Sequence, residues 1–370
     1  MGGDIMGVAV YPEQAGSVHV TELAQPGPGP DEALVRVRRV GVCGTDKEII
    51  DAKFGTAPPG AQELILGHEV LGTIEAVGDD VTTLRPGDLV TATVRRPDDC
   101  PTCRAGQSDM CLWGTYTERG IISAHGYMAE SFTEHVRYLI PIPPELEPVG
   151  VLVEPLSVVE KAYRQATLIQ RRLAVWTPQT AIVLGAGPIG LLGTLLLREQ
   201  GLDVYTLART SAPNPAATIV AAAGAHYVST RETSFAELRS SLPNVDLIFE
   251  STGASALAFD GMESLGINGV LVLLSITGGN RRHDIPADAI NRSLVLGNKV
   301  VVGSVNAATE DFSSGVRRLS RFEHLWPGLT ATLITERLRG FDDAHWIAEA
   351  ATGGVKTVLE FDAPAARAPH

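Results

Sequence analysis

Two patterns of hydrophobic and polar positions divide the chain. Through the first 150 residues, short runs of Val, Ile and Thr are broken by Gly, Pro and Asp, as in EALVRVRRVGVCG and GDLVTATV. This pattern is typical of β-strands joined by turns. From about Thr180 onward, continuous apolar runs such as AIVLG, DLIFE and GVLVLL alternate with longer helical segments. Such runs are buried on both faces of a parallel sheet, so this part predicts a doubly wound α/β domain.

The segments that follow these patterns complete the predicted domains. Residues 155–173 carry apolar positions at helical spacing, which predicts a linker helix. After Asn306 the segment FSSGVRRLSRFEHLWPGLTATLITERL is predicted helical, KTVLEF is predicted to be a last strand, and APAARAPH a frayed tail. A chain of 370 residues is longer than one core usually supports. We expect one domain from 1–176 with 308–370, and a nucleotide-binding domain from 177–307.

Composition excludes several classes of partner. The formal net charge of -13, without a block of Lys and Arg, argues against nucleic-acid binding. No apolar stretch approaches the roughly 18 residues of a membrane span, and the N-terminus does not resemble a signal peptide. We therefore expect a cytoplasmic protein without a membrane partner. Three of the four cysteines lie within twelve residues, which favours metal binding over a disulfide framework.

A glycine-rich turn stands between a predicted strand and a predicted helix. The strand AIVL is followed by Gly185, Gly187 and Gly190 in the spacing G-x-G-x-x-G, with Pro188 and Ile189 between the last two. In this context the first glycine permits a tight turn, the second lets the backbone approach a pyrophosphate, and the third lets helix and strand pack closely. The sequence therefore predicts a site for a nicotinamide dinucleotide.

The end of the second predicted strand bears on the choice of dinucleotide. An acidic residue there would hold the ribose hydroxyls of NAD, but the strand ends in Ala208, Arg209 and Thr210, and Asp203 lies at its other end. A guanidinium can pair with a 2′-phosphate and stack on adenine. This predicts NADP as the preferred cofactor, with NAD tolerated. The alternative is that Arg209 is an ordinary surface charge.

Three separated segments carry candidate metal ligands. They are GVCGTD with Cys43 and Thr45, GHE with His68 and Glu69, and VEP with Glu154, each placed at the end of a predicted β-like segment. Cys, His and a carboxylate are suitable ligands for zinc and can leave a fourth position open. Taken singly, the cysteine is more often a small buried hydrophobe and the histidine a core or surface residue.

Together, these motifs resemble the zinc-dependent medium-chain dehydrogenases. GVCGTD, then GHE 25 residues after the cysteine, then the glycine-rich turn, occur in the order of that family and cover nearly the whole chain. Within the family, GVCGTDKEI, YTERGI, HGYMAE, EPLSVVEKA and VGSVN are most similar to the glucose 1-dehydrogenases. The resemblance implies a GroES-like β-rich catalytic domain, a Rossmann domain, and a homo-oligomer, either a dimer or a tetramer.

The resemblance also implies residue roles. Cys43 and His68 match catalytic zinc ligands, Glu69 matches a third ligand that can come and go, Glu154 matches a nearby carboxylate acting directly or through water, and Thr45 matches the hydroxyl that relays the proton. The sugar-binding positions resemble Thr45, Glu118, Glu154 and Asn306. Paired acceptors suit a polyol, because each buried sugar hydroxyl needs a partner. The alternatives are a loop carboxylate for Glu118 and a backbone-satisfying side chain for Asn306.

A second metal site is altered relative to the family. Cys100, Cys103 and Cys111 resemble the structural-zinc lobe with its four cysteines in the pattern C-x₂-C-x₂-C-x₇-C, but Pro97 occupies the first position. Asp98 or Asp99 could supply an oxygen ligand instead. The alternative is a lobe that folds without metal.

The predicted function is zinc-dependent oxidation of an aldose, foremost D-glucose to its lactone, with hydride transfer to NADP or NAD. One alternative is the same machinery acting on another polyol, sugar acid or secondary alcohol, because loops set the substrate on a shared fold. A second alternative, from another class, is a non-catalytic NADP-binding sensor. Metal content would distinguish the sensor from the enzyme.

Overall fold

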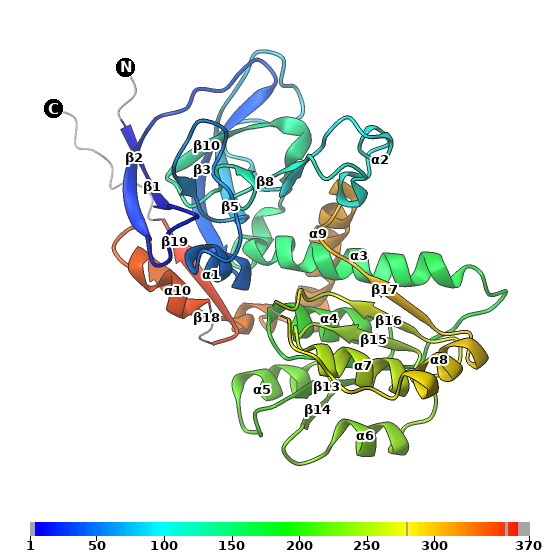
Figure 1. Ribbon diagram of the computed structural model, residues 1–370. Helices are drawn as coiled ribbons and strands as arrows, with labels where there is room; N and C mark the ends of the chain where they lie inside the picture. Colours follow the sequence, from blue (N-terminus) through cyan, green and yellow to red (C-terminus); the bar gives the residue numbers. More distant parts are fainter. Residues whose placement is uncertain (1–3, 279, 352–353, 362–370) are drawn as a thin grey trace. The chain divides into compact units, whose positions relative to one another are not determined.

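The computed structural model describes residues 4–278, 280–351 and 354–361, and these form two compact units (Figure 1). Unit 1 contains the residues up to Glu154, Ala307–Ser320 and the residues from Ile334 on, and unit 2 contains Pro155–Asn306 and Arg321–Leu333. The expected domain boundaries after residues 176 and 307 stay a prediction. Among the described residues, no helix is long and apolar enough to cross a membrane. The predicted homo-oligomer and cytoplasmic location are not tested by the fold.

Unit 1 is rich in β-structure. A large sheet has the strand order β11-β6-β5-β3-β19-β18, with β10 also pairing with β3, and smaller sheets have the orders β2-β1-β4 and β7-β8-β9. The strands are β1 Asp4–Val10, β2 His19–Ala24, β3 Glu32–Val42, β4 Leu64–Ile65, β5 Glu69–Val77, β6 Leu89–Ala92, β7 Arg95–Arg96, β8 Thr117–Arg119, β9 Ser123–Ala124, β10 Ser131–His135, β11 Leu139–Pro141, β18 Ile334–Arg339 and β19 Lys356–Glu360. The short helices are α1 Gly44–Ile50, α2 Pro101–Arg104 and α10 Ile347–Ala350.

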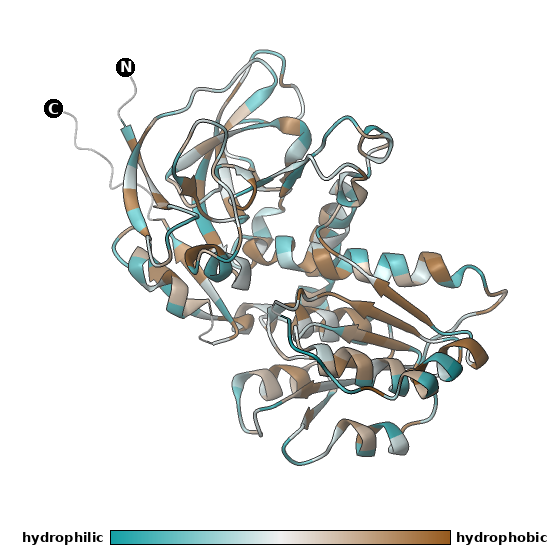
Figure 2. Cartoon of the chain, in the orientation of Figure 1, coloured by the Kyte–Doolittle hydropathy of each residue, from teal (hydrophilic) through white to brown (hydrophobic). Residues whose placement is uncertain are grey.

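Unit 2 is a doubly wound α/β domain. Its parallel sheet has the order β14-β13-β12-β15-β16-β17. From β12 the chain builds the sheet outward to β14 on one side and then, from β15 to β17, on the other side. Right-handed crossovers in these two directions place helices on both faces of the sheet. The strands β15, β16 and β17 are largely hydrophobic along their length (Figure 2). Strands β15 and β16 are almost entirely buried, as expected for strands covered on both faces, whereas the edge strand β17 is only partly buried.

The elements of unit 2 run in strict alternation along the chain. They are β12 Thr180–Leu184, α4 Pro188–Glu199, β13 Asp203–Ala208, α5 Pro215–Ala222, β14 His226–Ser229, α6 Phe235–Ser241, β15 Leu247–Glu250, α7 Ser255–Ser264, β16 Val270–Leu273, α8 Ala287–Leu296 and β17 Val300–Gly303. Two longer helices flank this series, α3 Val153–Gln170 before it and α9 Thr309–Leu325 after it. The predicted linker helix is therefore confirmed, beginning two residues earlier and ending three residues earlier than expected.

One predicted element is wrong. The segment ITERL was expected to be helical, but it lies in strand β18, which pairs in parallel with β19. Ile334 and Leu338 are the buried positions of this strand, and a separation of four residues fits a helix as well as a strand. Pairing with β19, which is distant in sequence, decides between the two. The strand KTVLEF is confirmed as β19, and the predicted tail APAARAPH lies outside the described residues.

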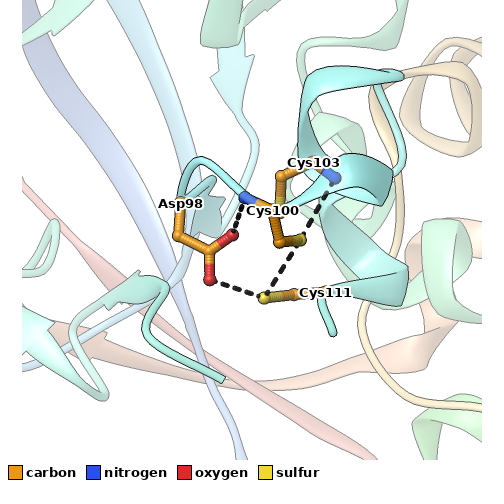
Figure 3. Close-up of side chains that lie close together, drawn as sticks. All are labelled: Asp98, Cys100, Cys103 and Cys111. Carbon is orange, nitrogen blue, oxygen red and sulfur yellow. Dashed lines mark hydrogen bonds between the residues drawn. The ribbon is translucent and has the colours of Figure 1, made fainter. Parts of the chain in front are cut away.

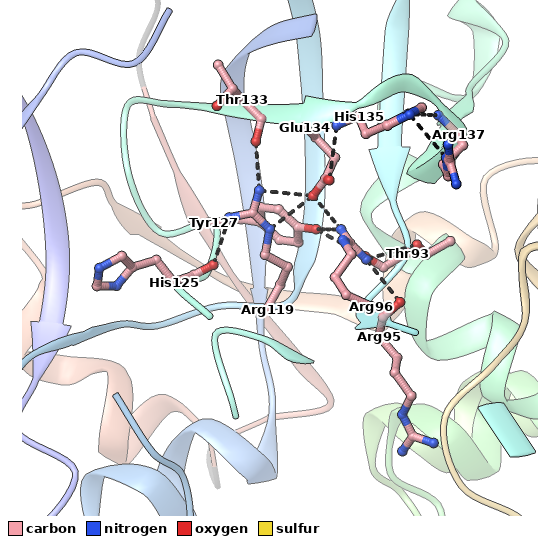
Figure 4. Close-up of polar contacts among 10 residues, drawn as sticks. All are labelled: Thr93, Arg95, Arg96, Arg119, His125, Tyr127, Thr133, Glu134, His135 and Arg137. Atoms are coloured by element: carbon pink, nitrogen blue, oxygen red, sulfur yellow. Dashed lines mark hydrogen bonds and ion pairs between the residues drawn. The ribbon is translucent and has the colours of Figure 1, made fainter. Parts of the chain in front are cut away.

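A buried charge cluster joins strands β7, β8 and β10 of unit 1 (Figure 4). The carboxylate of Glu134 accepts hydrogen bonds from the Arg96 guanidinium and from Arg119 Nε at 3.0 Å. Arg96 Nη2 also donates to the Tyr127 hydroxyl at 3.0 Å, and Tyr127 donates to the Thr93 carbonyl at 3.0 Å. Burial raises the pKa of Glu134, but the charges of Arg119 and Arg96 outweigh it and hold the pKa below its usual value. The cluster is therefore ionised at neutral pH.

Candidate active site

Two neighbouring strands bring the first candidate ligands together. Cys43 follows the end of β3 and is the N-cap of α1, while His68 directly precedes β5. The two strands pair antiparallel with Gly41 opposite Glu69, so the end of one lies beside the start of the other. As a result, Cys43 Sγ, a His68 ring nitrogen and a Glu69 carboxylate oxygen all lie within 4.8 Å of one another.

The predicted placement of these segments needs correction. Cys43 directly follows β3, whereas His68 lies three residues after the end of β4 and directly before β5, of which Glu69 is the first residue. Glu154 is in the first turn of helix α3 and not at a strand end. It is nevertheless a neighbour of the group, since its ionisation is influenced by Glu69 and His68.

The side chains of this group influence one another's ionisation, and most of them are buried. Glu154 is 9% exposed, and burial raises its pKa to about 7 with a further contribution from the charge of Glu69. Burial alone would lower the pKa of His68, but the charge of Asp46 and the hydrogen bond with Cys43 raise it well above its usual value. Several buried carboxylates and the buried His68 thus lie beside the half-buried Cys43 thiol.

Asp46 is a member of the site that the sequence analysis missed. Its Oδ2 accepts a hydrogen bond from the Cys43 backbone N–H at 2.8 Å, and its Oδ1 lies 3.6 Å from His68 Nδ1. A buried carboxylate beside a metal-ligating histidine commonly orients its ring, and the fully buried Asp46 is placed for that role beside His68. The signal was present in GVCGTD, where Asp46 stands at the third position of the helix that Cys43 caps.

The donor set fits a zinc ion. A thiol, an imidazole and a carboxylate are the ligands that zinc takes in catalytic sites. Among the described residues, His68 Nδ1 and Asp46 Oδ1 are buried without a hydrogen-bond partner, which is costly unless another group satisfies them. The Thr45 hydroxyl lies beside this group and accepts a hydrogen bond from the Cys43 thiol at 3.8 Å.

Glu118 is held by a partner that the sequence analysis also missed. Strands β7 and β8 place Arg95 opposite Glu118, whose Oε1 accepts a hydrogen bond from Arg95 Nε at 3.0 Å and forms an ion pair with Nη2 at 2.9 Å. The guanidinium also stacks on Tyr116, 3.6 Å from the ring centre. The loop after Glu118 packs on the turn before His68, since a Cβ on Gly120 would lie 2.4 Å from the Gly67 carbonyl oxygen.

In unit 2 the glycine-rich turn has the geometry of a pyrophosphate cradle. Gly185 has φ of +106°, a conformation that side chains disfavour. A Cβ on Gly190 would lie 2.0 Å from the Gly185 carbonyl oxygen, so only glycine fits there. Gly187 is the N-cap of α4, which begins at Pro188, and its Cβ position meets no heavy atom of the described residues within 4 Å. The helix N-terminus is therefore open to an anion.

Arg209 lies at the same edge of the sheet as this turn. It directly follows β13, is exposed, and its carbonyl oxygen accepts a hydrogen bond from the Ser229 hydroxyl at 3.4 Å. The next residue, Thr210, accepts one from the Tyr227 hydroxyl at 2.7 Å. Asp203 lies at the opposite end of β13, where it pairs with His226. Asn306 follows β17 in unit 2 and has φ of +60°.

The cysteine-rich lobe gathers a second set of ligand atoms (Figure 3). Asp98, Cys100, Cys103 and Cys111 each contribute one atom to a group whose members all lie within 4.8 Å of one another. Asp98 Oδ2 accepts hydrogen bonds from the Cys111 thiol at 2.9 Å and from the Thr115 hydroxyl at 2.8 Å. Of the two aspartates considered from the sequence, it is Asp98 that joins the cysteines. Three sulfurs and one oxygen could hold a structural zinc ion.

Known protein families match the sequence of both units. A family profile described as the alcohol dehydrogenase GroES-like domain matches residues 29–144, and one described as the glucose dehydrogenase C-terminus matches residues 147–361. The glucose 1-dehydrogenase of Methanocella arvoryzae is 44% identical over 333 residues, covering 90% of this chain and 92% of the relative. Glucose 1-dehydrogenase 1 of Caldivirga maquilingensis is 40% identical and covers 96% and 98% of the two chains.

A solved structure shows the same likeness. The glucose dehydrogenase of Haloferax mediterranei, in complex with NADP, Zn and gluconolactone, superposes with a TM-score of 0.88 at 34% identity, covering 97% of this chain and 99% of that one. The predicted fold class, a β-rich GroES-like domain with a Rossmann domain, is confirmed. The chain belongs to the glucose dehydrogenase family of the zinc-dependent medium-chain dehydrogenases.

Proposed function

We propose that this protein is a zinc- and NADP-dependent glucose 1-dehydrogenase. It removes a hydride from C1 of D-glucose and a proton from the C1 hydroxyl, giving the lactone and NADPH. The observation that carries this proposal is the convergence of the half-buried Cys43 with the buried His68 and Glu69, beside Glu154, in a chain that resembles an enzyme solved with NADP, Zn and gluconolactone.

The candidate zinc ligands and their neighbours would act on the hydroxyl group of the sugar. Cys43, His68 and Glu69 would hold the ion, with Glu154 acting directly or through water. A bound zinc ion supplies a Lewis acid that stabilises an alkoxide on the sugar. Asp46 orients His68, and the Thr45 hydroxyl, which can both accept and donate, takes the sugar proton and passes it towards solvent.

The cofactor is proposed to bind at the carboxyl edge of the unit 2 sheet. The turn from Gly185 to Gly190 receives the pyrophosphate, and Arg209 pairs with the 2′-phosphate of NADP. NAD, which lacks that phosphate, would bind more weakly. The positive charge of Arg209 and the distance of Asp203 at the far end of β13 support this preference.

The sugar is proposed to contact Glu118, Glu154 and Asn306 in addition to Thr45. Arg95 forms a buried ion pair with Glu118 and holds its carboxylate in place, where it can accept hydrogen bonds from sugar hydroxyls. We also propose that Asp98, Cys100, Cys103 and Cys111 hold a second, structural zinc ion.

The proposal is tested by following NADPH at 340 nm with D-glucose, D-galactose, D-xylose, sorbitol and simple secondary alcohols, before and after chelator treatment. We expect reduction of NADP with aldoses, loss of activity after chelation, and recovery on addition of zinc. Activity with sorbitol or simple alcohols alone would contradict the proposed substrate. Zinc-loaded, NADP-binding protein without activity on any of these compounds would contradict the proposed reaction.

A further inference from the structure

The buried side chain of Lys356 is not used by any of the proposed roles. Lys356 begins β19 and is 2% exposed. Its ammonium forms an ion pair with Glu69 Oε2 and donates a hydrogen bond to the Val42 carbonyl at 2.9 Å. It therefore contacts one candidate zinc ligand directly and the residue just before another, Cys43.

Three adjacent strands determine this contact. β19 pairs with β3 so that Thr357 lies opposite Val42, and β3 pairs with β5 so that Gly41 lies opposite Glu69. The ion pair is thus part of the sheet register and does not depend on a loop. A buried ammonium is strongly disfavoured without a charged partner, and Glu69 supplies one.

Gly41 provides the space for this ion pair. A Cβ at this position would lie 2.0 Å from Glu69 Oε2 and 2.9 Å from Lys356 Cε. The lack of a side chain at position 41 therefore leaves the seat that the Glu69 carboxylate occupies when it pairs with Lys356. We call this place the Gly41 seat.

We propose that Lys356 is a positioning residue that competes with the bound metal for Glu69. It draws the carboxylate into the Gly41 seat and so sets how firmly the ion is held at Cys43 and His68. The inference rests on the proposed function, because it assumes that zinc binds beside Glu69. When Glu69 turns towards the metal, Lys356 loses its ion pair and keeps the hydrogen bond to Val42.

The test measures the rate at which a coloured chelator, 4-(2-pyridylazo)resorcinol, removes zinc from the holoenzyme. Lys356→Met removes the competing charge, and Gly41→Ala fills the seat without changing any charge. Each variant is expected to slow zinc removal about tenfold or more, because Glu69 is then available to the metal throughout. Release from the cysteine-rich lobe, if seen as a second phase, should be unchanged and serves as an internal control.

A matched pair of variants separates this inference from a simple charge effect. A lysine repels a nearby zinc ion whether or not Glu69 is present, so Lys356→Met is also made in a Glu69→Gln background. We expect no further slowing there. Equal slowing in both backgrounds, or faster zinc removal from Lys356→Met or Gly41→Ala, would overturn the proposal.

The design also distinguishes failure of the inference from failure of the proposed function. Zinc exchange that follows the expected pattern in a protein without glucose activity would contradict the function and leave the role of Lys356 standing. Normal glucose oxidation by the wild type, with zinc exchange unchanged in Lys356→Met and Gly41→Ala, would support the function and contradict the role of Lys356. If Cys43→Ser left the zinc content unchanged, zinc would not bind at this site, and both would be refuted. Because Lys356→Met could impair folding, Gly41→Ala provides the independent second variant.

Discussion

Replacing Arg95 by Met tests how the protein prepares Glu118 for a sugar. Methionine retains much of the apolar stem but removes the guanidinium, whose Nε donates to Glu118 Oε1 at 3.0 Å and whose Nη2 forms an ion pair with it at 2.9 Å. It also removes weaker contacts to the Ser108 and Asp109 carbonyls at 3.3 and 3.4 Å. Glu118, which is 6% exposed, then loses this guanidinium partner.

The magnitude follows from two effects. Removing one partner of a buried ion pair costs about 3–5 kcal/mol of folding free energy. The hydrogen bonds from the sugar to a carboxylate that has lost its guanidinium partner should also weaken, by about 1 kcal/mol each. For one or two bonds to the sugar, KM for D-glucose should rise roughly 5- to 30-fold, since 1.4 kcal/mol corresponds to tenfold. KM for NADP should stay unchanged.

The assay combines steady-state kinetics, with glucose and NADP varied in turn, and urea unfolding followed by circular dichroism. Glu134→Gln is the matched control, because it also removes a buried charge from an arginine but touches none of the candidate site residues. We expect both variants to lose stability and only Arg95→Met to lose affinity for glucose. If Arg95→Met lost stability but kept its KM for glucose within twofold, Glu118 would not be a sugar ligand.

Three further predictions concern the cofactor, the lobe and the pH dependence. Arg209→Ala should weaken NADP binding about 10- to 100-fold and change NAD binding little, which fluorescence titration of the two cofactors would measure. Cys111→Ser should lower the zinc content by about one equivalent, measured by plasma emission spectrometry, without abolishing activity; an unchanged content would indicate a metal-free lobe. Because the pKa of Glu134 is lowered in the folded state, the stability that this group contributes should be present above its unfolded value of 4.5 and be lost as the pH falls through the folded value. Wild type should therefore lose its stability advantage over Glu134→Gln in acid, and a constant advantage down to pH 2 would contradict this.

The elements with strong local signals were predictable from the sequence. The turn at Gly185–Gly190 was recognised because a strand and a helix flank it, and each expected glycine has the predicted geometry. The group of Cys43, His68 and Glu69 followed from motif order, although the sequence did not show that antiparallel pairing joins them. Local patterns suffice where one short segment determines the geometry.

The residues that were missed depend on contacts distant in sequence. Lys356 reaches Val42 across 314 residues, and no pattern around KTVLEF marks it as part of the site. β18 was predicted helical because Ile334 and Leu338 satisfy both periods, and its pairing with β19 decides its conformation. Asp98 and Asp99 were equivalent in sequence, and the path of the loop before α2 brings Asp98 to the cysteines.

The central claim is that this chain moves a hydride from C1 of glucose to NADP. The most direct measurement uses D-glucose carrying deuterium at C1 and determines the deuterium content of the NADPH by mass spectrometry. The account predicts one deuterium in each NADPH formed, with gluconolactone or its hydrolysis product gluconate as the oxidised sugar. NADPH without deuterium, or a sugar product that retains it, would contradict the account.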